Sequence, residues 1–239
     1  KARGSMARRQ PPSSQIPEHI KRECAVAGDA FRKPHRRLRR QAMIETPVRP
    51  WMQMGAVFVG DAGVARGSAM PYDCPNQRTE YDLTRLPALT GPWRGLGAGP
   101  NLLAIESAID ECAIGAGMDP LAFRLRNLQV PRLQAVLQRA ADMADWPRRR
   151  PGGQRGVLRG RGIAGGIYKG MSFAAAVADV SVDTATGAVR VDDFWCAHDC
   201  GRVINPDQVR AQTEGNLVWC IGMTLVEALP FADGQVQAR

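Results

Sequence analysis

A glycine-rich loop that leads into a helix is the part of this sequence best suited to holding a ligand. Four glycines and two prolines are interleaved in residues 91–100, which permits unusual backbone angles and close approach of the backbone to a bound group. Asn101 follows as the predicted N-cap of a helix, and the free N–H groups at a helix N-terminus attract anions. Arg94, the only charge in the loop, lies between Trp93 and Leu96, so its guanidinium could be held rigidly beside a ligand. The pattern is that of a generic anion site. Because most glycine loops before helices only connect two elements, it does not by itself indicate a function.

Cys196, His198 and Cys200 alternate along the chain, so on a strand their side chains would share one face and could bind a metal. A structural zinc site takes four ligands, and no further Cys/His cluster supplies the remainder. An iron–sulfur cluster needs four suitably spaced cysteines, which the sequence lacks. We therefore expect partly buried strand residues here and no direct protein ligand to a metal. The six cysteines of the chain are expected to be reduced residues of the core.

Positive charge is concentrated at one end of the chain. The 239 residues carry a net charge of +9, and residues 1–50, with 13 Lys/Arg and 4 Asp/Glu, account for all of it. A basic arm that binds nucleic acid or an acidic partner is one interpretation. We favour a solvated, poorly ordered segment, or unrelated sequence joined to a truncated domain, because neither a pattern of interleaved aromatic residues nor a known nucleic-acid module accompanies the charge. No apolar run approaches the roughly 20 residues that a membrane span needs.

Helical periodicity organises the middle of the chain. The helix after the glycine loop is expected to end at Gly115 or Gly117, and Asp119 with Pro120 has the pattern of an N-cap and a first helical residue. Pro131 should end that second helix. A third, amphipathic helix is predicted over 132–146, with six residues directed inward: Leu133, Val136, Leu137, Ala140, Met143 and Ala144.

Strand signals appear in the second half of the chain. Residues 148–161 are rich in Arg, Gly and Pro, and we interpret them as a solvated linker between domains rather than a phosphate grip. Alternating residues on either side of a turn at 183–187 predict a β-hairpin over 172–197. A long helix is predicted from about Pro206, and Gly215 and Gly222 interrupt it, which suggests close approach of something bulky. The expected fold class is α+β.

Three strings around the glycine loop resemble the molybdopterin-binding large subunit of the xanthine dehydrogenase/aldehyde oxidase family, most closely the bacterial isoquinoline 1-oxidoreductase β-subunit type. They are the Trp-Arg-Gly-Leu-Gly of Trp93–Gly97, the helical Glu106–Ala113 and the Asp-Pro-x-x-x-Arg-x-x-Asn-Leu of Asp119–Leu128. Gly-x-Gly-Ile-Ala at 160–164 is similar to the start of that family's second cofactor domain.

A second long match, Cys196–Glu227, resembles the family's Asp-x-Gly-x-x-x-Asn-Pro, then Gln-x-Glu-Gly, then a glycine-containing helix. The residues that stand in those places are Asp199, Gly201, Asn205, Pro206, Gln212, Glu214, Gly215 and Gly222. The resemblance covers about residues 65–239.

The resemblance implies roles for individual residues. Gln212 would approach the oxygen ligands of molybdenum, where a neutral amide can donate a hydrogen bond without adding charge. Arg94 would lie beside the metal centre, hold the substrate and stabilise developing negative charge. Leu96 stands where purine-oxidising relatives place a stacking phenylalanine, so a stacked purine is not expected. The resemblance further implies a substrate pocket at Trp93 and Leu96, cofactor binding by Gly95, Gly97, Gln212 and Gly215, and structural support from Glu106, Asp110 and Glu214, with Glu106 and Asp110 pinning the loop.

The activity that the resemblance implies for the whole protein is the oxidation of N-heterocycles or aldehydes with water. The implied cofactor is molybdenum-molybdopterin, in its cytosine dinucleotide form, and electrons leave through iron–sulfur clusters on a small [2Fe-2S] partner subunit. The bacterial cytoplasm is the expected compartment, with the periplasm as the alternative, and nucleic acid is not an expected partner. The predicted division is a basic, low-complexity or non-family segment at 1–64, the end of a first molybdopterin-binding domain at 65–150 and the start of a second at 151–239.

The departures from the family pattern suggest that the site is incomplete. The chain has no Gly-Glu-Pro string, which carries the family's catalytic glutamate, and it lacks the glycine-rich strings that hold the pterin. A catalytically incomplete fragment or structural piece, which needs a complementing large-subunit fragment, is therefore one alternative. A basic-arm interaction protein is the other.

Overall fold

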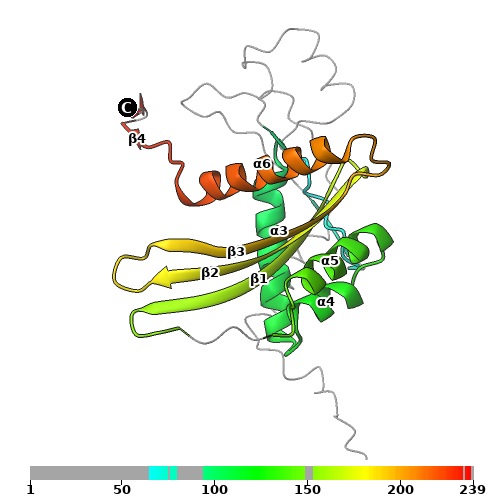
Figure 1. The fold of residues 1–239 in the computed structure, drawn as a ribbon, viewed down its shortest axis with the longest axis horizontal. Helices are drawn as coiled ribbons and strands as arrows, with labels where there is room; N and C mark the ends of the chain where they lie inside the picture. The colour runs from blue at the N-terminus through cyan, green and yellow to red at the C-terminus, as the bar shows by residue number, and fades with distance from the viewer. Residues whose placement is uncertain (1–64, 75, 80–93, 149–152, 234, 238–239) are drawn as a thin grey trace, which may run out of the picture.

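The computed structural model describes residues 65–74, 76–79, 94–148, 153–233 and 235–237 (Figure 1). The expected basic N-terminal segment and Trp93 lie outside the described residues. The fold is mixed α+β, as expected. Its helices are α3 (Ala98–Gly115), α4 (Pro120–Arg126), α5 (Pro131–Met143) and α6 (Pro206–Leu225), and its strands are β1 (Val157–Tyr168), β2 (Ser172–Asp183), β3 (Val189–Asp199), β4 (Phe231–Ala232) and β5 (Gln235–Val236).

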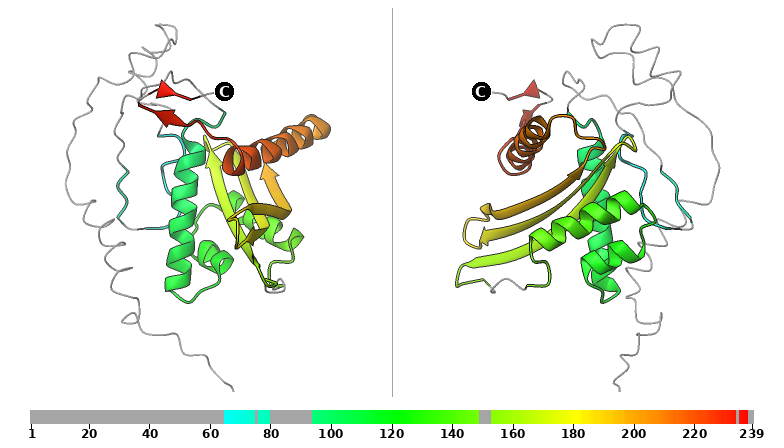
Figure 2. Two further views of the ribbon diagram at one scale, coloured as in Figure 1. Left: turned by 90° about the vertical axis from the view of Figure 1, so that its left-hand side faces the viewer. Right: turned by 45° about the vertical axis from the view of Figure 1, so that its right-hand side comes forward.

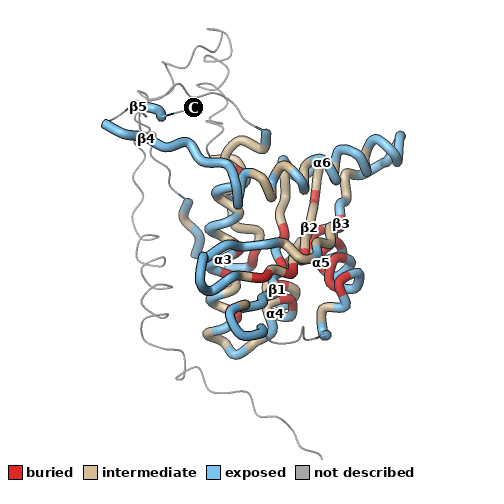
Figure 3. The backbone as a smooth tube through the Cα atoms, turned by 60° about the vertical axis from the view of Figure 1, so that its left-hand side comes forward, coloured by how far each residue is buried: buried red, intermediate tan, exposed pale blue. Residues whose placement is uncertain are grey.

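An antiparallel sheet in the order β1-β2-β3 forms the centre of the molecule. Helix α5 packs across one face of this sheet and α3 runs beside β1, while α6 crosses the opposite face (Figure 2). The core lies between α5 and the sheet, where Leu133, Leu137 and Val177 are fully buried (Figure 3). The segments predicted to belong to two domains thus share one hydrophobic core.

The predicted hairpin is confirmed as β2 and β3. Alternate residues of β2 are buried against α5, including Phe173, Ala175 and Val177, which is the period-2 pattern of a half-buried strand. The turn is fixed locally, because Asp183 Oδ1 accepts hydrogen bonds from the backbone N–H groups of Ala185 (2.9 Å) and Thr186 (2.8 Å).

The linker predicted at 148–161 is wrong for its last five residues, which begin strand β1. Arg161 is not solvated: its guanidinium forms two hydrogen bonds of 2.6 and 2.9 Å with the buried carboxylate of Asp179. The glycines that gave β1 its linker-like composition serve close packing on both faces. A Cβ at Gly165 would lie 3.1 Å from Leu137 of α5, and one at Gly166 only 2.6 Å from Leu102 of α3.

The local start and stop signals of the helices largely hold. Asp119 caps α4 by accepting from the N–H of Ala122 at 2.9 Å, and α3 ends at Gly115 as expected. Two predictions are wrong. Asn101 is not an N-cap, because α3 begins at Ala98 and the Asn101 side chain instead donates to the carbonyl of Arg66. Met143 is 37% exposed rather than part of the inward side of α5.

The described cysteines are free, but none of them is fully buried. The expectation of core cysteines is therefore wrong for Cys74 and Cys220, which are exposed. None of the described helices combines the length and hydropathy needed to cross a bilayer.

Candidate functional site

The loop before α3 forms a tight bend with two successive left-handed residues. Gly95 has φ +82° and Leu96 has φ +54°, and the carbonyl of Gly95 accepts from the N–H of Ala98 at 3.0 Å. A leucine in this region is uncommon, because its Cβ crowds the following carbonyl. Gly97 then stands at the N-cap of α3 with no side chain to cap the helix. Over residues 94–98, the predicted ligand loop is thus a defined and slightly strained turn.

Arg94 projects from this bend onto α6. Its Nη1 donates to Asn216 Oδ1 at 3.0 Å, and its guanidinium carbon lies 4.8 Å from the centre of a Trp219 ring. Gln212, Asn216 and Trp219 recur at i, i+4 and i+7, so they share one side of the helix. The structure therefore brings Arg94 to the side of α6 that carries Gln212.

The remaining family-matched residues of α6 are open to solvent. Gln212 and Glu214 are exposed, and no described residue lies within 4 Å of a Cβ added at Gly215. The close neighbour expected at Gly215 is not among the described residues. The helix itself begins as expected, because Asn205 Oδ1 caps it by accepting from the N–H of Gln208 at 3.1 Å and Pro206 is its first residue.

Glu106 and Asp110 belong to a buried network with Arg124, a residue to which the sequence assigned no role. Arg124 is fully buried and donates to Glu106 Oε2 (2.9 Å), Asp110 Oδ1 (2.6 Å) and two backbone carbonyls. Glu106 also accepts from the hydroxyl of Tyr72 (2.7 Å) and the N–H of Gly165 (3.0 Å). These bonds join α3 to α4, β1 and Tyr72, whereas we expected them to pin the glycine loop. The Arg in the Asp-Pro-x-x-x-Arg string was the available signal.

The charges in this network stabilise each other. Burial opposes the charge of Arg124, but Glu106 and Asp110 outweigh it and hold the pKa of the guanidinium above its usual value. Burial, followed by the Glu106 carboxylate, raises the pKa of Tyr72 well above its usual range. A buried ion pair of this kind is tolerated because each partner has further hydrogen bonds.

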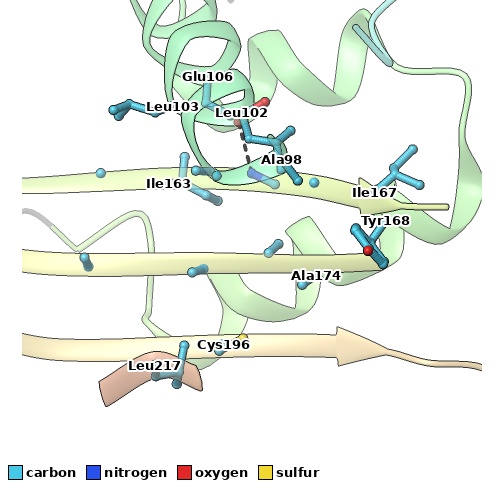
Figure 4. A pocket seen from close by; sticks show the side chains of 18 of the residues that line it. Ala98, Leu102, Leu103, Glu106, Ile163, Ile167, Tyr168, Ala174, Cys196 and Leu217 are labelled. Atoms are coloured by element: carbon cyan, nitrogen blue, oxygen red, sulfur yellow. Dashed lines mark hydrogen bonds between the residues drawn. The ribbon is translucent and has the colours of Figure 1, made fainter. Parts of the chain in front are cut away.

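A cavity of about 620 Å³ lies between α3, the sheet and α6 (Figure 4). Its floor is the sheet face turned away from α5, which is built of small residues, and Leu217 of α6 lies near Cys196 at one side. Neither Arg94 nor Gln212 lines it. The small residues of the floor are Gly162, Ala164, Gly166, Ala174, Ala176 and Ala178.

The Cys196-x-His198-x-Cys200 string does not gather into a metal site, and no group of three or more potential metal ligands occurs among the described residues. His198 instead bridges two elements. Its Nε2 lies 2.8 Å from Ser172 Oγ at the start of β2, and its Nδ1 lies 3.2 Å from Thr213 Oγ1 on α6. Burial raises the pKa of the Cys196 thiol, which disfavours the thiolate that binds metals.

Two molybdopterin cofactor-binding domain models match the chain, one over residues 114–239 and the other over 48–128. The chain therefore belongs to the molybdopterin-binding large subunits of the xanthine dehydrogenase family.

The chain is also similar to parts of several known proteins. The chain is 39% identical over 187 residues to a nicotinate dehydrogenase chain of Pseudomonas putida, covering 73% of this chain and 16% of the relative. It is 34% identical over 181 residues to the isoquinoline 1-oxidoreductase β-subunit of Brevundimonas diminuta, covering 74% and 22%. It is 29% identical over 169 residues to the membrane-bound aldehyde dehydrogenase (pyrroloquinoline-quinone) of Gluconacetobacter polyoxogenes, covering 64% and 22%. The chain thus spans 16% to 22% of the length of these relatives.

Proposed function

We propose that this chain is part of the large subunit of a molybdenum hydroxylase, and that Arg94 and Gln212 face the molybdenum cofactor. The observation that carries the proposal is the meeting of the loop and α6: Arg94 donates to Asn216 at 3.0 Å, one turn beyond Gln212. Family membership, established by the domain matches, supports the same class of function.

The two candidate side chains fit an anionic cofactor with exposed oxygen atoms. Arginine keeps its charge at any physiological pH, and a glutamine amide offers two N–H donors without charge. Both residues are exposed, and no described residue outside α6 crowds Gly215, which leaves room for a large group. When bound, the molybdenum cofactor supplies two-electron oxidation with water as the source of oxygen.

Within this site the residues of the chain would orient and stabilise. Arg94, held by Asn216 and Trp219, would hold a substrate oxygen or nitrogen and stabilise negative charge that develops there. Gly95 and Gly97 would let the backbone approach the cofactor. Trp93 and Leu96 would form an apolar wall of the substrate pocket, and the Glu106–Arg124 network would hold α3 behind the loop while Glu214 supports α6.

The substrate class that we propose is an N-heterocycle or an aldehyde, because the names of the relatives include nicotinate, isoquinoline and aldehyde oxidation. The absence of an aromatic face at Leu96 argues against a stacked purine. We further propose the cytosine dinucleotide form of the cofactor, a small [2Fe-2S] partner subunit and a bacterial cytoplasmic location. The division of the chain at residues 64/65 and 150/151 likewise remains a proposal.

The isolated chain should be catalytically incomplete. It spans 16% to 22% of the relatives' length, lacks a Gly-Glu-Pro string and has no buried residue in α6. We expect the chain alone neither to retain molybdenum nor to turn over, and to do both only with a complementing large-subunit segment and the iron–sulfur subunit.

The test is to produce the full chain in a bacterium that makes the molybdenum cofactor, alone and together with the complementing segment and iron–sulfur subunit. Molybdenum is measured by mass spectrometry, and oxidation of nicotinate, isoquinoline and an aldehyde is measured with electron acceptors. A complex without molybdenum would refute the cofactor proposal, whereas an active, metal-loaded chain on its own would refute the incompleteness.

Substitutions in the active complex test the residues. Arg94→Met and Gln212→Leu should each lower kcat/KM by about a hundredfold or more, as removal of a preorganised donor does. The matched controls are Arg210→Met and Gln208→Leu, at exposed positions of α6, the helix that carries Gln212. Activity within about twofold of the parent in both test variants would show that these two residues do not face the reacting group.

A further inference from the structure

Helix α6 is attached to the rest of the molecule without burying an apolar stripe. None of its 20 residues is buried, and Thr213 and Leu217, which approach the sheet, are only partly covered. Most helices in proteins are held by packing of an amphipathic face. Among the described residues, specific polar contacts therefore contribute much of what positions α6, and Gln212 with it.

One such contact runs from α6 to the sheet through His198. Thr213 Oγ1 donates its single proton to the carbonyl of Val209 at 2.8 Å, so its lone pairs are left to accept from His198 Nδ1 at 3.2 Å. Nδ1 must then carry a proton, and in the neutral ring Nε2 accepts from Ser172 Oγ at 2.8 Å. The imidazole is thus oriented from both sides, with one nitrogen on β2 and the other on α6.

The second contact runs from α6 to the loop through Arg94 and Asn216, at 3.0 Å. Both contacts lie close to Gln212: Thr213 is its neighbour in the chain, and Asn216 follows one turn later on the same side of the helix. We propose that His198 and Asn216 are positioning residues, which together fix the rotation of α6 and thereby the direction in which the Gln212 amide points. The inference rests on the proposed function for its catalytic meaning, but the contacts themselves can be tested without it.

Amide hydrogen exchange of the full chain, followed by mass spectrometry of α6 peptides, tests the contact with His198. His198→Asn keeps a donor near the position of Nδ1 and so can still reach Thr213. His198→Gln places its amide near the position of Nε2, so the hydrogen bond with Thr213 is lost. We expect exchange in α6 to be about three- to tenfold faster in His198→Gln and close to the parent rate in His198→Asn.

Matched variants test the remaining contacts. Asn216→Asp retains an acceptor for Arg94 and should preserve the protection of α6 from exchange. Asn216→Leu removes the acceptor and should accelerate exchange in α6 about as much as His198→Gln does. Ser172→Ala removes only the far partner of His198 and should leave α6 exchange near the parent rate. Exchange in β2 and α5 serves as the internal control for global unfolding, because a general loss of stability would accelerate these segments too.

Two results separate this inference from the proposed function. If His198→Gln and Asn216→Leu exchange as slowly as the parent in α6, the positioning role is refuted whatever the chain catalyses. If α6 exchange accelerates as expected and the assembled complex loses kcat with both variants but regains it with His198→Asn and Asn216→Asp, the inference holds in full. Accelerated exchange with unchanged activity would refute the assignment of Gln212 while the two contacts stand.

Discussion

Arg94 and Arg124 are both donors from family-like strings, but the structure uses them in opposite ways. Arg124 is fully buried, and its four hydrogen bonds to Glu106, Asp110 and backbone carbonyls tie α4 to α3. Arg94 is exposed, and it rests on Asn216 and Trp219 of a helix that itself has no buried residue. The comparison separates an arginine that maintains the fold from one that is available to a ligand.

The difference follows from the cost of isolating a charge. A guanidinium removed from water must be matched by acceptors at every donor, and losing one partner leaves an uncompensated charge in the interior. An exposed guanidinium keeps part of its hydration, so it can exchange a water for a ligand oxygen at little cost to stability. The burial of an arginine, rather than the number of its bonds alone, therefore predicts how far its substitution lowers the stability of the fold.

The largest effect on stability is expected for Arg124→Met. The substitution leaves the buried carboxylate of Glu106 without its cation, and breaking a buried pair in this way typically costs about 3–5 kcal/mol. Urea denaturation of the full chain, monitored by circular dichroism, measures the change in the free energy of unfolding. Arg126→Met, at the exposed end of the same helix, is the control and should change stability by less than about 1 kcal/mol. Equal effects of the two substitutions would contradict the structural role of Arg124.

The same network predicts a loss of stability at high pH. The pKa of Tyr72 is raised in the folded protein, so the folded phenol stays neutral while the unfolded one ionises near its ordinary value of about 10. Its contribution is therefore complete below that value and is lost as the pH rises further, by up to about 1.4 kcal/mol per pH unit. Denaturation midpoints between about pH 8 and pH 11 should fall less steeply in Tyr72→Phe. An unchanged slope in that variant would show that Tyr72 titrates in the folded state as freely as in the unfolded chain.

A smaller effect is expected on the acid side, at the partly exposed pair of Arg132 and Asp199. The two hydrogen bonds from Arg132, both 2.7 Å, followed by the N–H of Gly201, hold the pKa of Asp199 well below its ordinary value. This contribution is present above the ordinary pKa of about 4 and is lost as the pH falls toward the folded value. Thermal midpoints of the parent and Asp199→Asn should therefore converge as the medium becomes acidic. Asp142→Asn, at an exposed carboxylate of α5, is the control.

Local signals in the sequence predicted much of the fold. The Asp119–Pro120 start of α4 and the hairpin turn at Asp183 depend only on residues three or four positions apart. Strand β1 was not predicted because its glycines are required by neighbours distant in the sequence: Gly165 packs closely on Leu137, and Gly166 on Leu102. No local pattern states which helix will lie on a strand.

The candidate site was predictable only through the resemblance. Nothing in the spacing of Arg94 and α6 indicates that residues 94 and 216 meet, and the structure shows that they do. Glu106 and Asp110 were singled out as supports of the loop, whereas their common partner Arg124 was not, since that contact depends on how α3 packs on α4. His198 was weighed as a metal ligand, whereas the direction of its ring is set by Ser172 and Thr213.

The smallest effect on stability, and the sharpest contrast with Arg124, is expected for Arg94→Met. The side chain is exposed, so its loss should change the free energy of unfolding by less than about 1 kcal/mol. The same substitution should nevertheless accelerate exchange in α6, because Asn216 and Trp219 lose the guanidinium that rests on them. Arg94→Lys keeps the charge but not the planar fork that reaches Asn216 while stacking on Trp219, so it should resemble Arg94→Met in α6 exchange. If Arg94→Met unfolded the chain as severely as Arg124→Met, the loop would be part of the structural core, and the distinction between the two arginines would fail.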